Sequence, residues 1–206
     1  MPHIATWTAE PRAETQIVMR GWGIAYADEV AQDRDDRGAL WVRRPNNQGE
    51  GKPQLGNVHA LRQRHVMNSL LCQVCAEPAD QDARGTLWLL EDSRADWIGW
   101  PNDLLTTHPP ICLPCARESV RRCPHLLRGH VAVRVRKTDV VGVYGLRYYP
   151  GRLLPHAGAR DVVPYSDPAI RWVLASQQVR GLNDCTLVDL QTEGAPDCRI
   201  PPRRHP

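Results

Sequence analysis

The chain has 206 residues and contains no phenylalanine, so tryptophan, with seven residues, must supply much of the large aromatic surface of any core. It also lacks a long uninterrupted apolar run, which argues against a membrane-spanning helix and a membrane partner. The first residues carry Glu10, Arg12 and Glu14 and no apolar stretch of the kind found in signal peptides. We therefore expect a cytoplasmic protein.

Net positive charge is small as well. The 26 basic residues face 23 acidic ones, which leaves a formal charge of +3. A dedicated nucleic-acid coat protein has a strongly basic balance, so composition does not indicate one. Only Lys52 and Lys137 are lysines. A GC-rich genome produces the same arginine bias, so arginine abundance alone says little about function.

Cysteine, in contrast, is present in a pattern. Four of the seven cysteines form two C-x-x-C pairs, Cys72 with Cys75 and Cys112 with Cys115, and 36 residues lie between the pairs. A thiolate sulfur binds Zn²⁺ at about 2.3 Å, and four of them complete a tetrahedral site. Two intervening residues let one tight turn direct both sulfurs at one ion. The sequence therefore predicts one structural Zn²⁺ bound by these four cysteines, in a reducing compartment.

A second set of ligands has to be weighed. Cys123 and His125 follow the second pair, and with Cys112 and Cys115 they offer a C-x-x-C…C-x-H site. That arrangement leaves the first pair without a metal unless a second ion binds. The two-pair site is the simpler interpretation, and whether Cys123 and His125 join a metal site stays open at this point.

The segments that flank the pairs have their own signals. Residues 57–71 contain no Gly or Pro and begin with Asn57, which predicts a helix capped by that residue. Residues 85–91 read as a short strand, and residues 116–123 as a helix that follows the second pair. A knuckle, then a strand, then a second pair at a helix start resembles the treble-clef zinc finger over about residues 57–128.

The same frame occurs in HNH endonucleases, whose chemistry needs a histidine base between the knuckles. The only histidine there is His108, which lies close to the second pair and is followed by two prolines. The chain thus resembles the HNH-like frame without its catalytic histidine. It also resembles uncharacterised zinc-knuckle proteins of high-GC bacteria and their phages, a resemblance that implies no activity.

One catalytic alternative remains. Cys75-Ala76-Glu77 is similar to the C-A-E of zinc-dependent deaminases, in which the glutamate shuttles protons around a zinc-bound water. Cys75, Cys112 and Cys115 would then be the ligands. Pro78 and a polar run follow Glu77 where that family has a buried helix, and Cys72 would close the position that the reaction needs open.

Strand signals dominate outside the pairs. Residues 16–27, 39–43 and 186–190 read as strands, and the alternation over 130–136 predicts a half-buried strand with Arg134 facing water. We expect residues 137–139 to turn that strand into a partner at 140–149, and residues 150–165 to form a loop. Asp167 and Pro168 read as the cap and first turn of a helix that ends at Gly181.

These signals predict an α+β fold with small antiparallel sheets around a central treble-clef-like zinc finger. We divide the chain into a β-rich segment at 1–56, the four-cysteine finger at 57–128, a hairpin, helix and strand at 129–191, and a disordered tail at 192–206.

Two surfaces are candidates for partners. Arg117, Arg121 and Arg122 fall on the second finger helix, where arginine forks suit phosphate oxygens. Trp97 and Trp100 lie between the pairs and offer either an aromatic docking surface or a roof over a small core. We expect a non-catalytic zinc protein directed at nucleic acid. The alternatives are a protein–protein adaptor that uses the tryptophans and a deaminase-like hydrolase that uses Glu77.

Overall fold

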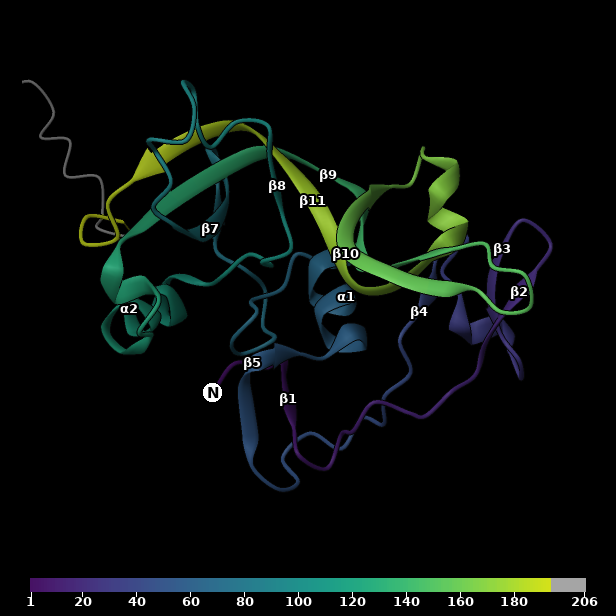
Figure 1. Cartoon of the computed structure of the whole chain (residues 1–206). Helices are drawn as coiled ribbons and strands as arrows, with labels where there is room; N and C mark the ends of the chain where they lie inside the picture. Colours follow the sequence, from purple (N-terminus) through teal and green to yellow (C-terminus); the bar gives the residue numbers. More distant parts are fainter. Residues whose placement is uncertain (194–206) are drawn as a thin grey trace, which may run out of the picture.

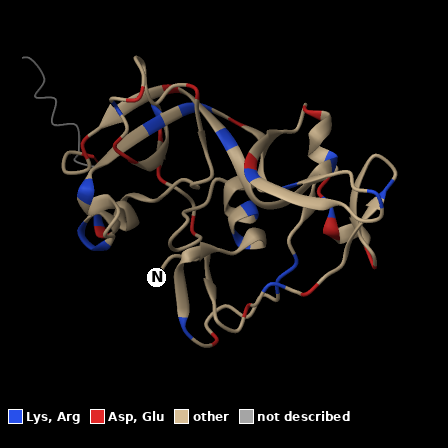
Figure 2. Cartoon of the chain, in the orientation of Figure 1, with Lys and Arg blue, Asp and Glu red and all other residues tan. Residues whose placement is uncertain are grey.

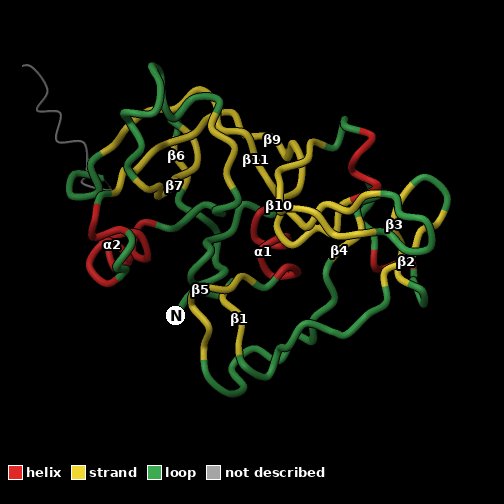
Figure 3. Tube along the Cα trace, in the orientation of Figure 1, coloured by secondary structure: helices red, strands yellow, loops and turns green. Residues whose placement is uncertain are grey.

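The computed structural model describes residues 1–193, which form a mixed α and β structure consisting mostly of strands (Figures 1 and 3). Within this part of the chain there are two α-helices, α1 (Ala60–Asn68) and α2 (Leu113–Arg122). No helix among these residues is long and apolar enough to cross a membrane.

Two long antiparallel strands, β9 (His130–Tyr149) and β11 (Val173–Val188), form the backbone of a seven-stranded sheet. Five shorter strands complete the sheet. They are β4 (Leu40–Trp41), β6 (Gln81–Asp82), β7 (Gly85–Glu91), β8 (Leu104–Thr106) and β10 (His156–Pro164). The order β4-β11-β9-β7-β6 is completed by β10 on β9 and β8 on β11. This sheet is larger than the small sheets predicted from the sequence.

Two smaller sheets come from the N-terminal part of the chain. One pairs β1 (Ala5–Trp7) with β5 (Pro53–Val58), and the other is the hairpin of β2 (Ile17–Arg20) and β3 (Gly23–Tyr26). The strand signal over 16–27 is thus confirmed, as two strands instead of one. The predicted helix over 57–71 begins only at Ala60, and His59 takes the capping position that was assigned to Asn57.

Three predictions for the C-terminal half are wrong. The predicted helix over 167–181 is a single short 3-10 turn at Pro168–Trp172, and the chain then enters β11. Residues 137–139 do not turn, because they pair with 181–183 in the middle of the β9–β11 ladder. The predicted loop over 150–165 contains β10, which pairs with the second half of β9.

A buried ion pair fixes the N-terminal segment to α1. Both Arg62 Nη atoms donate to the Glu10 carboxylate, at 2.6 and 2.7 Å, and the Glu10 side chain is fully buried. Arg62 also donates to the carbonyls of His3 and Ala5. Arg62 is only 4% exposed and thus fastens the N-terminal segment to α1 from the interior.

Arg134 is a second buried arginine. The alternation over 130–136 predicts that it faces water, but its exposure is 2%. Its guanidinium is ion-paired with Glu193, and Asp80 lies 2.6 Å away. Glu193 also forms an ion pair with Arg84. The predicted disordered tail at 192–206 thus includes a buried, ion-paired residue, Glu193, and residues 194–206 lie outside the described part of the chain.

Candidate metal centre

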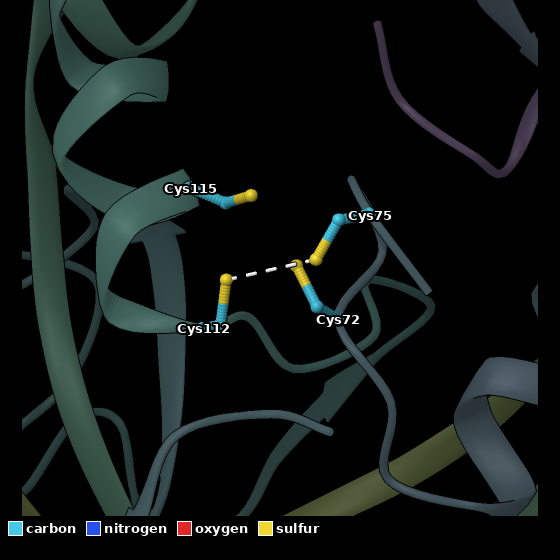
Figure 4. A group of neighbouring side chains, drawn as sticks. All are labelled: Cys72, Cys75, Cys112 and Cys115. Atoms are coloured by element: carbon cyan, nitrogen blue, oxygen red, sulfur yellow. Dashed lines mark hydrogen bonds between the residues drawn. The ribbon is translucent and has the colours of Figure 1, made fainter. Parts of the chain in front are cut away.

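Four cysteine thiols converge between the loop that follows α1 and the start of α2 (Figure 4). The Sγ atoms of Cys72, Cys75, Cys112 and Cys115 all lie within 4.8 Å of one another. The Sγ atoms of Cys75 and Cys112 are 3.7 Å apart. This is far longer than a disulfide bond of about 2.05 Å. It matches the edge of about 3.8 Å that a tetrahedron of sulfurs has around Zn²⁺ at about 2.3 Å.

The first pair lies on a tight turn that hangs from the end of α1. Leu70 takes a left-handed backbone conformation and directs the chain out of the helix. Cys72 N–H then donates to the Glu77 carbonyl at 2.7 Å, and Ala76 N–H donates to the Cys72 carbonyl at 2.9 Å. Inside this turn the Val74 N–H points at Cys72 Sγ, 3.4 Å away. Backbone donors aimed at sulfur are the environment that a metal-bound thiolate requires.

The second pair is presented by the N-terminus of α2. Cys112 is the N-cap residue, and Pro114 occupies a first-turn position where its missing N–H costs no hydrogen bond. Because Cys115 falls in the first turn of the helix, its thiol lies near that of Cys112 (Figure 4). The positive end of the helix dipole also favours negative charge on these sulfurs.

Hydrogen bonds between main-chain atoms join the two pairs through β7. Asp80 N–H donates to the Ile111 carbonyl, and Ile111 N–H donates to the Leu87 carbonyl at 3.0 Å. Leu87 N–H in turn donates to the Asp80 carbonyl. Cys72 is buried against the same apolar cluster as Leu87 and Ile111. The relative placement of the pairs therefore rests on backbone contacts as well as on the sulfurs.

The electrostatics of the cluster disfavour four thiolates without a bound cation. Burial raises the pKa of Cys112 to about 11 and raises the pKa of Cys115 as well. For Cys72 burial acts in the same direction, but backbone donors from Cys112, Cys75 and Val74 outweigh it and lower the pKa. Four thiolates would repel one another strongly at these distances without a cation. The donor set and geometry thus fit a soft divalent cation, for which Zn²⁺ is the usual choice.

The remaining candidate ligands lie elsewhere. Among residues 1–193, the four thiols are the only group of three or more potential ligands that converge on one point. Cys123, at the end of α2, is half-buried, and His125 is exposed beyond it. Cys112 and Cys115 therefore converge with the first pair and not with Cys123 and His125. Glu77, the acid/base of the deaminase alternative, is exposed on the knuckle, and its carbonyl accepts from Cys72.

The three arginines of α2 have different environments. Arg117 is half-buried and donates to the carbonyls of Leu190 and Glu193, at 3.1 and 2.6 Å. Arg121 and Arg122 are exposed, and Arg122 is paired with Glu118 one turn earlier. Arg117 thus fastens α2 to the segment that follows β11, while Arg121 faces solvent without an ion pair in the described part of the chain.

The two tryptophans between the pairs also differ. Trp100 is 7% exposed and packs in a cluster with Trp88 and Val133. Trp97 is 40% exposed, and its neighbour Ile98 is fully exposed. The structure thus places Trp100 in a core and Trp97 at the surface, so the two do not form one aromatic patch.

Comparison with known proteins adds no relative. No protein-family model matches the chain, and neither the curated proteins nor the solved structures contain a significant match. The site therefore has to be interpreted from its own geometry.

Proposed function

We propose that the four cysteines hold one structural Zn²⁺ in a treble-clef-like finger and that the protein is a non-catalytic nucleic-acid-binding protein. The order of elements supports the finger: a knuckle with two thiols, the β6–β7 hairpin, and a helix that begins with the other two thiols. Zn²⁺ would supply the positive charge that offsets the repulsion between four thiolates, and it would link the knuckle to α2.

The observation that carries the non-catalytic part is the fourth thiol. Catalytic zinc sites have three protein ligands and leave one position for water or substrate. Here Cys72 Sγ lies in the same 4.8 Å cluster as the other three sulfurs, so an ion bound there would have all four positions filled by protein. This argues against both the deaminase-like and the hydrolytic alternatives.

Zinc analysis of purified protein tests the metal. We expect one zinc per chain in the wild type and a clear loss of zinc in Cys72→Ser. Cys123→Ser is the matched control, because Cys123 is half-buried at the end of α2 and lies outside the cluster. A zinc content that is zero in the wild type, or unchanged in Cys72→Ser, would refute this assignment.

The nucleic-acid part is supported by the outward face of α2. Arg121 and Arg122 are exposed on a helix whose start is fixed at the knuckle, and Arg128 is exposed just beyond it. A net charge of only +3 means that any binding must be local. Arg117 is less available for phosphate, because it is bonded to two carbonyls.

Fluorescence anisotropy with duplex and single-stranded probes at several salt concentrations tests this. Each duplex phosphate that the protein neutralises contributes about 0.9 to the slope of log affinity against log salt. If both exposed α2 arginines contact duplex phosphates, Arg121→Ala combined with Arg122→Ala should make this slope shallower by about 1.8, while the zinc content stays unchanged. Absence of binding to any probe at low salt would disprove the nucleic-acid role.

A protein–protein adaptor is the second candidate. It is favoured by one observation, the exposed pair of Trp97 and Ile98 on the loop between β7 and β8. This pair is smaller than the patch of two tryptophans that the sequence predicted, because Trp100 belongs to the core.

A further inference from the structure

A cavity in the described part of the chain lies far from the cysteines. It has a volume of about 840 Å³ and is bounded by the β2–β3 hairpin, the loop around Gly38 and the short turn at Pro168–Trp172. In Figure 1 the hairpin lies at the right-hand end of the molecule, whereas α2 lies at the left. Ligand pockets in proteins usually measure about 300 to 1,000 Å³, so this one is large enough for a small organic ligand.

The walls of this cavity are held firmly together. Gly23, at the start of β3, lies against Arg171 so closely that a Cβ atom at this position would be 2.8 Å from Arg171 Cβ and closer still to its carbonyl oxygen. Ile24 and Tyr26 of the hairpin pack in one buried cluster with Leu40 and Leu174. The hairpin therefore has a fixed position beside the Pro168–Trp172 turn.

Positive charge dominates the lining. Four arginines, Arg20, Arg34, Arg37 and Arg171, line the cavity, while Asp167 is the one carboxylate that does so. Asp167 is already engaged, because its Oδ1 accepts the Ala169 N–H at 2.8 Å. The cavity thus offers several cations and very little negative charge to balance them.

Two of these arginines are occupied and two are available. Arg34 is paired with Glu29 and also donates to two carbonyls, and Arg37 donates to the Val140 carbonyl. Arg20 makes only two long contacts of 3.4 Å with carbonyl oxygens. Within residues 1–193, neither Arg20 nor Arg171 forms an ion pair. Their guanidinium groups can therefore donate hydrogen bonds to an anionic ligand.

An aromatic ring stands beside these charges. Trp22 lies at the tip of the hairpin, between Gly21 and Gly23, and is 83% exposed. Gly21 has a φ of 59°, which fits the tight turn that carries the ring outward. Trp172 lines the same cavity from the other side and is half-buried. Exposed aromatic faces next to arginines are how sequence-tolerant proteins bind unpaired bases and their phosphates.

We infer that this groove binds single-stranded nucleic acid, with a base stacked on Trp22 and neighbouring phosphates paired with Arg20 and Arg171. The inference rests on the proposed nucleic-acid function and gives it a second, separate surface. Duplex is disfavoured at this surface, because its bases are stacked on one another and present no free face to Trp22. Four arginines but only one carboxylate line the groove. This charge favours nucleic acid, which carries a phosphate at every nucleotide, over a protein partner, which has no regular series of negative charges.

Anisotropy with a labelled oligothymidylate of about ten nucleotides tests the groove. Trp22→Leu keeps an apolar side chain but removes the ring, and we expect it to weaken binding about 5- to 150-fold. Trp22→Tyr retains a ring and should keep most of the affinity. Loss of two phosphate contacts in Arg20→Ala with Arg171→Ala should lower the salt slope by about 1.4 for a single strand.

Arg94→Ala with Arg152→Ala is the control for charge, because both arginines are exposed and lie outside the groove. If this control weakens binding as much as the groove double variant does, the effect is one of net charge and the inference is wrong. It is also wrong if oligothymidylate binds and the groove variants retain full affinity, although the proposed nucleic-acid function then stands.

Three further outcomes separate the possible ligands. If thymidine monophosphate competes as well as the unlabelled oligonucleotide does, the groove is a site for free nucleotides, and the inference that it binds single-stranded nucleic acid is wrong. Polyglutamate that competes equally would identify a general polyanion site and overturn base stacking. If the wild type binds no single-stranded or duplex probe at low salt, the inference and the proposed function fail together.

Discussion

At the scale of single residues, buried charge explains why this arginine-rich chain does not have a uniformly basic surface. Arg62 and Arg134 are 4% and 2% exposed, and each is paired with a carboxylate from a distant part of the sequence. Arg117 is bonded to main-chain carbonyls. These arginines fasten segments together, so the number of arginines overstates what the surface can offer to an anion.

Glu10→Gln should strongly destabilise the protein. The change removes the negative charge that faces the buried Arg62 guanidinium and replaces one of the two acceptor oxygens with an NH₂ group. Breaking a buried ion pair in this way typically costs about 3–5 kcal/mol. Urea unfolding at pH 7 measures the loss. Glu14→Gln, at an exposed position, is the matched control and should change stability by less than about 0.5 kcal/mol. Equal stabilities for the two variants would contradict the assigned role of the pair.

The same pair predicts a dependence on pH. Burial alone would raise the pKa of Glu10, but hydrogen bonds from Arg62 and the Trp7 N–H outweigh it and hold the pKa below its ordinary value. A carboxyl with a lowered pKa stabilises the fold above the unfolded pKa of about 4.3, and this contribution is lost as pH falls through the folded pKa. The stability difference between wild type and Glu10→Gln should therefore be full at pH 6–7 and shrink below about pH 4. A difference that grows on acidification would show that the sign is wrong.

Sequence reasoning at this scale succeeded where the signal was local. Two cysteines separated by two residues can direct both thiols at one point from a single turn, so the four candidate metal ligands could be predicted, and the structure brings all four together. Glu10 and Arg62 are 52 positions apart and carry no pattern that links them. The groove residues were missed for the same reason, although a tryptophan between two glycines at 21–23 does mark an exposed turn.

At the scale of elements, long-range strand pairing overrides local helix signals. Asp167 and Pro168 do start a turn as predicted, but Val173 and the residues after it pair with β9 along most of the length of β11. The sequence of β11 mixes apolar and polar residues without a clean alternation, so its pattern alone does not separate a strand from a helix. In contrast β7 was predicted at its observed bounds, because Gly85 and the apolar run after it are unambiguous.

The β2–β3 hairpin gives a test at this scale. Gly23→Ala places a methyl group against the backbone of Arg171, and that backbone cannot move without shifting the Pro168–Trp172 turn. We expect a loss of about 1–3 kcal/mol in unfolding free energy. Gly49→Ala is the comparison, since nothing lies near its Cβ position, although its φ of 94° adds backbone strain that Gly23 does not have. If Gly23→Ala is as stable as wild type, the hairpin is not packed on this turn.

At the scale of the whole molecule, two regions of different character lie at the two ends of the β9–β11 ribbon. In Figure 1, α2 is at one end and the β2–β3 hairpin is at the other. The cysteine cluster lies at the start of α2, and the arginine-lined groove borders the hairpin. Basic residues are spread along the chain between them and are interspersed with acidic ones (Figure 2). On the proposed function, an extended single strand of nucleic acid would contact α2 and the groove as two separate points. Local binding of this kind is consistent with the low net charge of the protein.

Metal removal should therefore unfold one end of the molecule before the other. Cys72, Leu87 and Ala116 belong to an apolar cluster that shares no member with the one around Tyr26 and Leu174. Binding energy at structural zinc sites acts as folding energy, about 10–16 kcal/mol in small fingers. After chelation, hydrogen exchange should show lost amide protection in α2 and around the knuckle, while amides of β3 and the first half of β11 stay protected. Added Zn²⁺ should restore the lost protection. Uniform loss over the whole chain would instead mean that the sheet transmits the unfolding from end to end, and no loss at all would mean that the metal does not stabilise the finger.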